Sequence, residues 1–312
     1  TMGYSQKTSE PALDHAIAGA AGGFITRFLC QPLDVIKIRF QLQVEPISKH
    51  DVSKYKSVLQ AFVLIPREEG ISALWKGHVP AQLLSIVYGM VQFYSYNVCM
   101  KMMQREPGMK RWNHSMHFIA GASAGSIATI VSFPFDTIRT RLVAQSNNRQ
   151  IYNGVVYSLF FSMILRQESP RVFFSGLLPT LLQIAPHTGL QFAFYAFFTD
   201  FYRKHTSGTE KTSVYNSILS GSAAGLIAKT IVYPFDLTRK RLQIQGFQRG
   251  RVGFGKFFQC NGLLDCLRVT VREEGVRGLF KGLVPSQVKA AATTALHFTV
   301  YEQVLLLLKI LR

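Results

Sequence analysis

The chain has 312 residues, of which 48% are hydrophobic and 17% are charged, whereas a soluble domain usually has about 25% charged residues. Lysine and arginine outnumber aspartate and glutamate by 35 to 17, so the formal charge is +18. A soluble nucleic-acid-binding protein would be more polar, and the positive mean hydropathy instead favours a membrane protein that handles anions. The four cysteines show neither pairing nor metal-ligand spacing, which argues against a disulfide scaffold.

The N-terminal residues 1–14 contain neither the apolar core of a signal peptide nor an arginine-rich amphipathic segment, so we expect targeting information to be internal. Six apolar stretches follow, each long enough for a tilted helix to cross about 30 Å of hydrocarbon: 16–40, 78–100, 115–142, 177–200, 215–242 and 283–308. An even number of spans places both termini on one side. Shorter amphipathic segments, expected along the membrane surface, lie near 55–66, 153–166 and 261–273.

The chain repeats itself three times. A proline is followed two residues later by aspartate with a period close to one hundred residues, at Pro32 and Asp34, Pro134 and Asp136, and Pro234 and Asp236. This periodicity predicts one domain, 1–312, built from three similar units at 12–110, 111–211 and 212–312. A GxxxG stripe precedes each proline and predicts close helix contacts in lipid.

Charged residues recur inside the apolar stretches, where each is costly unless it is paired or hydrated. The pattern P-x-D-x-x-[KR]-x-R appears in every repeat, as Asp34, Lys37 and Arg39, as Asp136, Arg139 and Arg141, and as Asp236, Arg239 and Arg241. One alternative is that the aspartate and the basic residue three positions later form a separate surface ion pair in each repeat. Recurrence beside a proline that bends the helix favours a shared site where the three helices converge.

This pattern, followed about thirty residues later by acid-Gly-x4-aromatic-[KR]-Gly, resembles the mitochondrial carrier family over nearly the whole chain. Repeat two departs from it, since Ser169 and Ser175 replace a glycine and a basic residue. The resemblance implies an all-α membrane protein of six tilted transmembrane helices in three pseudo-symmetric repeats, with three short matrix-side helices. It also implies alternating access across the mitochondrial inner membrane, with no bound cofactor and no metal.

The resemblance also implies a matrix-side gate of ion pairs between repeats, namely Asp34 with Arg139, Asp136 with Arg239, and Asp236 with Lys37. Gln41 and Gln243 follow one helical turn later and are expected to brace this gate, while Val143 stands at the third position. The family's opposite gate is largely missing here, which predicts that the outward-open state is easily populated. Cardiolipin is expected at helix N-termini, near Trp75, Lys76, Gly77, Asn153, Gly154, Gly176, Lys281 and Gly282.

Residues that break the threefold symmetry are the candidates for contact with a substrate. Arg27, Lys229 and Lys289 have no evident carboxylate partner in the sequence, so phosphate groups or water are expected to neutralise them. Snorkelling towards the interface is the competing explanation for these cations. Further candidates lie at similar depth and offer hydrogen bonds or aromatic faces: Leu84, Gln183, Ile184, Gln82, Tyr88, Gln92, His187, Gln191 and His297. Helix packing explains any single one of these equally well.

Four strings go beyond the family pattern and resemble the branch that carries thiamine pyrophosphate: PLDVIKIRFQLQ, WKGHVPAQ, YGMVQF and GLQF. That branch implies import of thiamine pyrophosphate in exchange for nucleotides, by a monomer that binds no nucleic acid. A carrier for adenine nucleotides or coenzyme A is the first alternative, and a non-transporting membrane scaffold is the second. An enzyme is not expected, because no catalytic triad, P-loop or metal cluster is present in the sequence.

Overall fold

The structure is a computed structural model, and it describes residues 12–44, 54–105, 113–145, 170–205, 210–245, 247 and 258–310. In these ranges, six long helices account for all six predicted apolar stretches. Their bounds are α1 Ala12–Leu42, α3 His78–Arg105, α4 Asn113–Ala144, α6 Leu177–His205, α7 Glu210–Gln243 and α9 Leu283–Ile310. The helical assignment of these stretches is therefore confirmed.

Shorter elements connect the long helices within a repeat. Two of the three predicted amphipathic segments are helices, α2 Val58–Glu69 and α8 Leu263–Glu274. The third, near 153–166, lies outside the described residues. A short 3-10 helix precedes the second long helix of each repeat, α3, α6 or α9, at η1 Ile71–Trp75, η5 Pro170–Phe174 and η7 Val276–Phe280.

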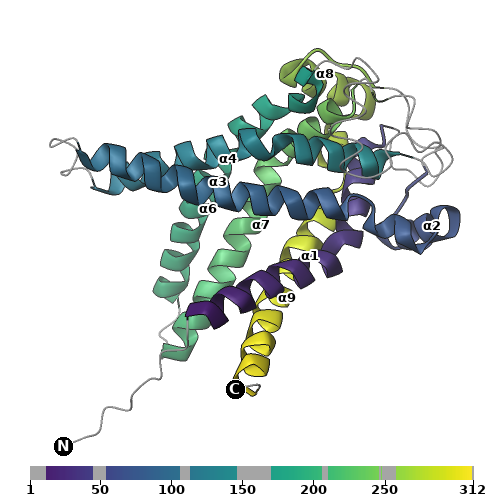
Figure 1. The fold of residues 1–312 in the computed structure, drawn as a ribbon. Helices are drawn as coiled ribbons and strands as arrows, with labels where there is room; N and C mark the ends of the chain where they lie inside the picture. The colour runs from purple at the N-terminus through teal and green to yellow at the C-terminus, as the bar shows by residue number, and fades with distance from the viewer. Residues whose placement is uncertain are drawn as a thin grey trace, which may run out of the picture.

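The long helices pack in three pairs, each of which joins neighbouring repeats. Helix α3 lies against α4, α6 against α7, and α9 against α1, so the last repeat closes onto the first. Figure 1 shows these pairs diverging from the end of the molecule that carries α2 and α8. The prolines of the repeat motif lie inside α1, α4 and α7, and each helix continues past its proline.

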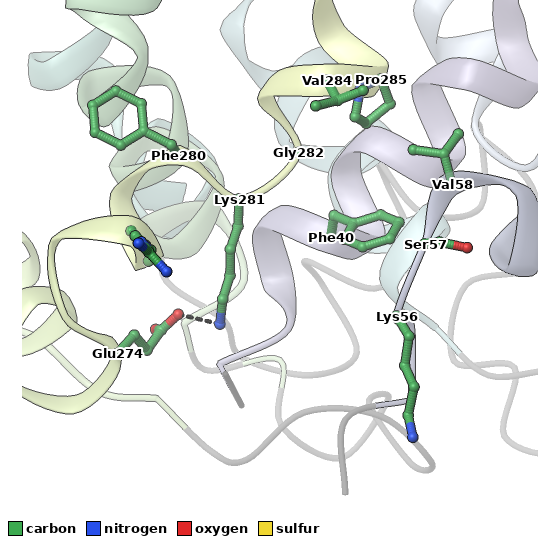
Figure 2. A pocket seen from close by; sticks show the side chains of 12 residues that line it. Phe40, Lys56, Ser57, Val58, Glu274, Phe280, Lys281, Gly282, Val284 and Pro285 are labelled. Atoms are coloured by element: carbon green, nitrogen blue, oxygen red, sulfur yellow. Dashed lines mark ion pairs between the residues drawn. The ribbon is translucent and has the colours of Figure 1, made fainter. Parts of the chain in front are cut away.

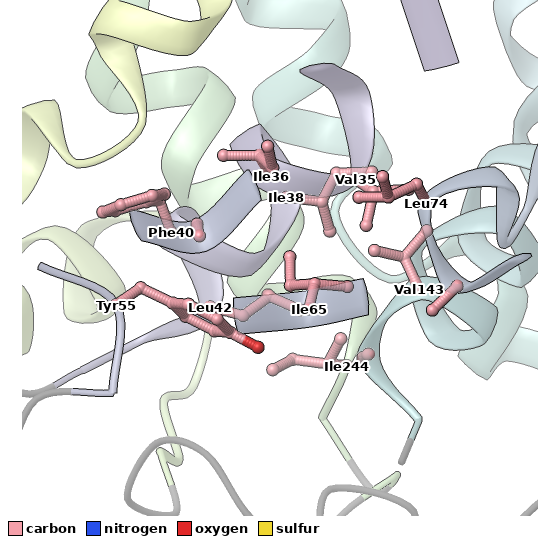
Figure 3. Close-up of a cluster of buried hydrophobic side chains, with 13 residues drawn as sticks. Val35, Ile36, Ile38, Phe40, Leu42, Tyr55, Ile65, Leu74, Val143 and Ile244 are labelled. Carbon is pink, nitrogen blue, oxygen red and sulfur yellow. The ribbon is translucent and has the colours of Figure 1, made fainter. Parts of the chain in front are cut away.

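The main hydrophobic core lies at the end where the pairs converge. Val35, Ile36 and Ile38 of α1 pack there against Ile65 of α2 and Leu74 of η1 (Figure 3). Val143 and Ala144 at the end of α4, and Ile244 just after α7, also belong to the cluster. Convergence of three repeats thus buries apolar surface that no single repeat could cover.

Along the rest of the molecule, large apolar side chains are exposed, including Phe24, Phe93, Phe192, Phe197 and Phe298. Exposed apolar surface of this extent fits a chain surrounded by lipid. Among the described residues, one stretch, Val276–Ile310, has both the length and the hydropathy of a membrane span.

The GxxxG prediction is wrong for this conformation. A Cβ atom added at Gly19, Gly23 or Gly121 would meet no atom within 4 Å, and one at Gly125 would lie 3.7 Å from the Tyr88 hydroxyl. The stripes lie towards the ends where the helix pairs diverge, so side chains rather than backbones make the contacts there.

Close backbone contact occurs instead at the glycines that directly precede α3, α6 and α9. Gly77, Gly176 and Gly282 all have positive φ, of 74°, 88° and 81°. A Cβ atom on Gly176 would lie 2.8 Å from the Arg239 carbonyl oxygen. The equivalent contacts are Gly77 with the Arg139 carbonyl and Gly282 with the Lys37 carbonyl, at 3.1 and 3.0 Å. Only glycine allows each helix to start this close to the next repeat.

We expect Gly176→Ala to destabilise the fold by about 3 kcal/mol, because it adds left-handed strain and overlap with the Arg239 backbone. The apparent melting temperature of purified protein in detergent measures the effect. Gly23→Ala is the matched control, since that helical position has open space and should be neutral or slightly stabilising. Equal melting temperatures for the two variants would contradict this reading of Gly176.

Candidate functional site

Three ion pairs form a ring at the converging ends of α1, α4 and α7. Lys37 Nζ lies 2.6 Å from Asp236 Oδ2, and Arg239 Nη2 lies 2.7 Å from Asp136 Oδ2. Arg139 pairs with Asp34 in the same way. Each pair joins two repeats, and the pairs are those that the resemblance implies. Their action as a gate stays a prediction.

Two glutamines brace the ring as expected from their spacing. Gln41 donates to Asp236 Oδ2 at 3.0 Å, and Gln243 donates to Asp136 Oδ2 at 2.5 Å. At the third position Val143 is fully buried in the apolar core. The ring is therefore braced by hydrogen bonds at two junctions and by packing at the third.

Two further cations join the ring, and sequence reasoning missed both roles. Lys240 Nζ lies 2.9 Å from Asp136 and also donates to Thr140 and Gln243. Lys289 Nζ of α9 lies 2.6 Å from Asp34 Oδ1. The expectation that Lys289 has no carboxylate partner is thus wrong, because packing of α9 against α1 brings it to Asp34. Lys240 directly follows Arg239, the motif cation that also contacts Asp136, and this adjacency is the signal that could have indicated Lys240.

The other two symmetry-breaking cations reach backbone oxygens. Arg27 Nη1 donates to the Ala81 carbonyl at 2.6 Å, and Lys229 Nζ donates to the Ser286 carbonyl at 2.6 Å. Within the described residues neither side chain forms an ion pair. We expected only a ligand or water to neutralise Arg27 and Lys229, and this expectation is corrected in part. One N–H donor of each side chain binds a backbone carbonyl, while the positive charge of each has no carboxylate partner among the described residues.

A cavity of about 1080 Å³ lies above the ring between α6, α7 and α9. Lys37, Asp236 and Arg239 of the ring line one end of it, and Lys229 lies on its wall. The remaining predicted substrate residues that line the cavity are Gln183, Ile184, His187 and Gln191. Cationic groups and neutral hydrogen-bonding groups thus share one space.

Other predicted substrate residues lie outside this cavity or in helix contacts. His297 packs against Gly22, and Gln82 contacts His78 and the Phe24 carbonyl. Tyr88 faces Gly125, as noted above. The lining of this cavity also does not include Arg27, Leu84, Gln92 or Lys289. The structure therefore brings five of the twelve candidates together in this cavity, all of them from repeats two and three.

A family model described as "Mitochondrial carrier protein" matches residues 8–107, 111–206 and 210–310. The chain belongs to the mitochondrial carrier family. It is 43% identical over 308 residues to the mitochondrial thiamine pyrophosphate carrier of Bos taurus, covering 96% of this chain and 95% of that protein. The Homo sapiens carrier of the same name is 44% identical over 289 residues, covering 92% and 89%. The thiamine pyrophosphate carrier 1 of Coccidioides immitis (strain RS) is 39% identical over 299 residues, covering 94% and 92%.

As a mitochondrial carrier, the protein is a transporter of the inner mitochondrial membrane, which it crosses more than once, and not an enzyme. The amphipathic helices α2 and α8 end in a second layer of ion pairs beneath the ring. Arg39 forms a fork with Glu69 at 2.5 and 2.7 Å, and Lys76 reaches the same carboxylate at 2.6 Å. In repeat three, Glu274 pairs with Arg241 and Lys281. The sequence motif shows these residues, but their pairing emerges only from the fold.

The lipid candidates divide by what their side chains contact. Trp75 donates to the Phe28 carbonyl at 3.1 Å, and both Lys76 and Lys281 turn towards buried carboxylates. Asn153 and Gly154 lie outside the described residues. A pocket of about 540 Å³ lies between the N-terminus of α2, at Lys56 to Val58, and the N-terminus of α9, at Gly282 to Pro285 (Figure 2).

We expect stability to depend on pH through Glu69. Burial raises the pKa of this carboxyl, but the hydrogen bonds and charges of Arg39 and Lys76 outweigh it and lower the pKa to about 2. A lowered pKa stabilises the fold above the ordinary value near 4.5, and this contribution of about 3 kcal/mol is lost as pH falls towards 2. Glu69→Gln should therefore lower the apparent melting temperature at pH 7 more than at pH 3. Glu68→Gln, on the half-exposed neighbour, is the control.

We expect the Lys37 and Asp236 pair to tolerate exchange of its charges. Lys37→Asp or Asp236→Lys alone leaves like charges facing each other and should cost about 3 kcal/mol. The double variant restores the pair, and the Gln41 amide oxygen, which has no partner in the structure, can then accept from the new lysine. Apparent melting temperatures measure the recovery. Additive losses in the double variant would contradict the pairing.

Proposed function

We propose that this carrier imports thiamine pyrophosphate into the mitochondrial matrix in exchange for nucleotides, by alternating access. The similarity to carriers named for that substrate, at 43% identity over 96% of the chain, carries the proposal. The cavity chemistry supports it. A diphosphate needs cations, and Lys229 with the ring residues Lys37 and Arg239 supplies them at one end.

The rest of the cavity suits the organic part of the ligand. Gln183, His187 and Gln191 offer donors and acceptors for an aminopyrimidine, and Phe298 adds an aromatic face to the lining. A volume of about 1080 Å³ is at the upper end of the size range of small-molecule sites, so the cavity accommodates the ligand with water.

We propose that all six long helices span the membrane and that the three repeats correspond to 12–110, 111–211 and 212–312. The charged residues in the middle of these helices include Lys37, Lys229, Asp236 and Arg239, which face the ring or the cavity, where a spanning helix tolerates them. With the ring closed, the cavity is open towards the intermembrane space. Breaking the ring while the other ends of the helix pairs converge would expose it to the matrix.

The pocket between the N-termini of α2 and α9 suits a cardiolipin phosphate, and we propose it as the lipid site of the repeat-three to repeat-one junction. The first backbone N–H groups of a helix have no partner inside the helix and attract anions. Repeat symmetry places the two other sites beside Gly77 and Gly176. A monomer contains all of these elements, so we propose that the carrier acts as a monomer.

We expect thiamine pyrophosphate, but not thiamine, to raise the apparent melting temperature of the purified carrier, because only the pyrophosphate engages the basic end of the cavity. Lys229→Gln should lower the affinity about tenfold by removing one cation from the diphosphate. Lys101→Gln, an exposed lysine of α3, is the matched control. A shift with ATP, dATP or coenzyme A alone would replace the proposed substrate while leaving the carrier assignment intact.

A further inference from the structure

Two of the four cysteines meet at the start of α8, outside the ring and the cavity. Cys260 precedes this helix, and Cys266 lies near its N-terminus. Both are buried in one hydrophobic cluster with Val44, Leu242 and Phe258. Figure 1 shows α8 at the end of the molecule where the helix pairs converge. Six positions separate the two cysteines in the sequence, a spacing typical of no regular pairing, so the fold is what brings them together.

A tight turn brings Cys260 back towards the first turns of α8. Gly262, directly before the helix, has a φ of 112°, in the left-handed region that favours glycine. The Asn261 backbone N–H donates to Asp265 Oδ2 at 2.7 Å, and the Cys266 backbone N–H donates to the Gly262 carbonyl at 3.1 Å. These hydrogen bonds hold the connection between the two cysteines in one conformation.

The two thiols are hydrogen-bonded to each other, with Cys266 as the donor and Cys260 as the acceptor. The Gln245 side-chain amide also donates to Cys260, to Sγ at 2.9 Å and to the carbonyl oxygen at 2.8 Å. The hydrogen bond from Cys266, together with that from Gln245, lowers the pKa of the Cys260 thiol despite its burial. Donation to Cys260 and burial raise the pKa of the Cys266 thiol. One sulfur is thus favoured as a thiolate, and a neutral thiol lies in contact with it.

Cys260 is also the member of the pair that lies closer to solvent. It is 5% exposed, and its neighbours Gln259 and Asn261 are both exposed, whereas Cys266 is fully buried. A molecule as small as hydrogen peroxide therefore needs only a slight opening of this segment to reach the Cys260 sulfur. Reactivity of a cysteine follows its thiolate character and its access to the oxidant, and both favour Cys260 as the first site of attack.

We propose that Cys260 and Cys266 form a modification site, a dithiol that hydrogen peroxide converts into a disulfide. The Cys260 sulfur attacks one peroxide oxygen, the O–O bond breaks, and the leaving hydroxide takes up the Cys260 proton as water, which leaves a sulfenic acid at Cys260. The Cys266 sulfur then attacks the Cys260 sulfur, so that the S–S bond forms, the S–O bond breaks, and the second hydroxide takes the Cys266 proton. Two thiols and one hydrogen peroxide thus give one disulfide and two water molecules.

The disulfide closes only the short loop 260–266, inside repeat three. It attaches the segment that follows α7 to α8, and the Cys260 carbonyl can keep its hydrogen bond from Gln245. A short closed loop restricts the unfolded chain modestly, so oxidation should stabilise this part of the carrier. The new bond joins no two repeats, so it leaves the contacts between repeats free to change.

The test uses the full-length carrier, purified in detergent, and a Cys30→Ala, Cys99→Ala variant in which the proposed pair holds the only thiols. Both proteins are reduced, freed of reductant, exposed to hydrogen peroxide, denatured and reacted with maleimide. We expect the variant to lose both thiols together, with a mass lower by two hydrogen atoms, and dithiothreitol to restore them. Peptide mapping of the native chain should show the same disulfide. The oxidised protein should melt about 3 °C higher than the reduced protein.

Serine variants separate the roles of the two sulfurs. Made in the background without Cys30 and Cys99, Cys266→Ser keeps the attacking thiol and should accumulate a sulfenic acid that dimedone traps. Cys260→Ser is the matched control, because it keeps only the fully buried thiol, which should stay reduced over the same time.

Two intact thiols after an exposure that oxidises a free-cysteine peptide would overturn the proposal. A disulfide from either residue to Cys30 or Cys99 in the native chain would overturn it as well, and so would trapping of a sulfenic acid in Cys260→Ser but not in Cys266→Ser. None of these measurements involves the transported substrate, so they test the dithiol independently of the proposed function.

Discussion

The structure depends on three carboxylates buried inside a bundle of apolar helices. An unpaired carboxylate there would cost several kcal/mol, so each aspartate must meet a cation. Asp34, Asp136 and Asp236 each find this cation on the first long helix of another repeat, α4, α7 or α1, which ties every repeat to its neighbour. Convergence at this level brings the starts of α3, α6 and α9 against the ring backbone, where Gly77, Gly176 and Gly282 leave room. It also gathers the apolar ends of the repeats into one core.

In the proposed function, selectivity comes from the departures from threefold symmetry. The three symmetric pairs of the ring do not by themselves distinguish one ligand from another, because every repeat contributes one carboxylate and one cation. Lys240 and Lys289 add charge on the repeat-three side, and the cavity with Lys229, Gln183 and His187 lies beside them between α6, α7 and α9. Repeat two contributes less to closure, with Val143 in place of a glutamine and Ser175 in place of a basic residue.

This distribution relates stability to transport. A closed ring that was too stable would trap the carrier in one state. The ion pairs of the layer beneath, Glu69 with Arg39 and Lys76 and Glu274 with Arg241 and Lys281, join residues of a single repeat. The same lysines also donate to backbone carbonyls of another repeat, Lys76 to Gln145 and Lys281 to Gln43 and Val44. The ion pairs therefore attach α2 and α8 to their own repeats, and the carbonyl contacts connect this layer to the neighbouring repeat.

By itself, the sequence determined the three repeats, the positions of the long helices and the short helices α2 and α8. These follow from periodicity and hydropathy, which are local. The partners in the ring were implied by the resemblance to the mitochondrial carrier family, and the structure shows the same pairs. Tertiary structure alone decided where single side chains point. Lys289 proved to be paired with Asp34 because α9 packs against α1. The two residues are 255 positions apart in the sequence, so no local pattern records their contact. The glycine stripes stayed open and His297 and Tyr88 entered helix contacts for the same reason: the divergence of the helix pairs is a property of the assembled ring, set by all three repeats together.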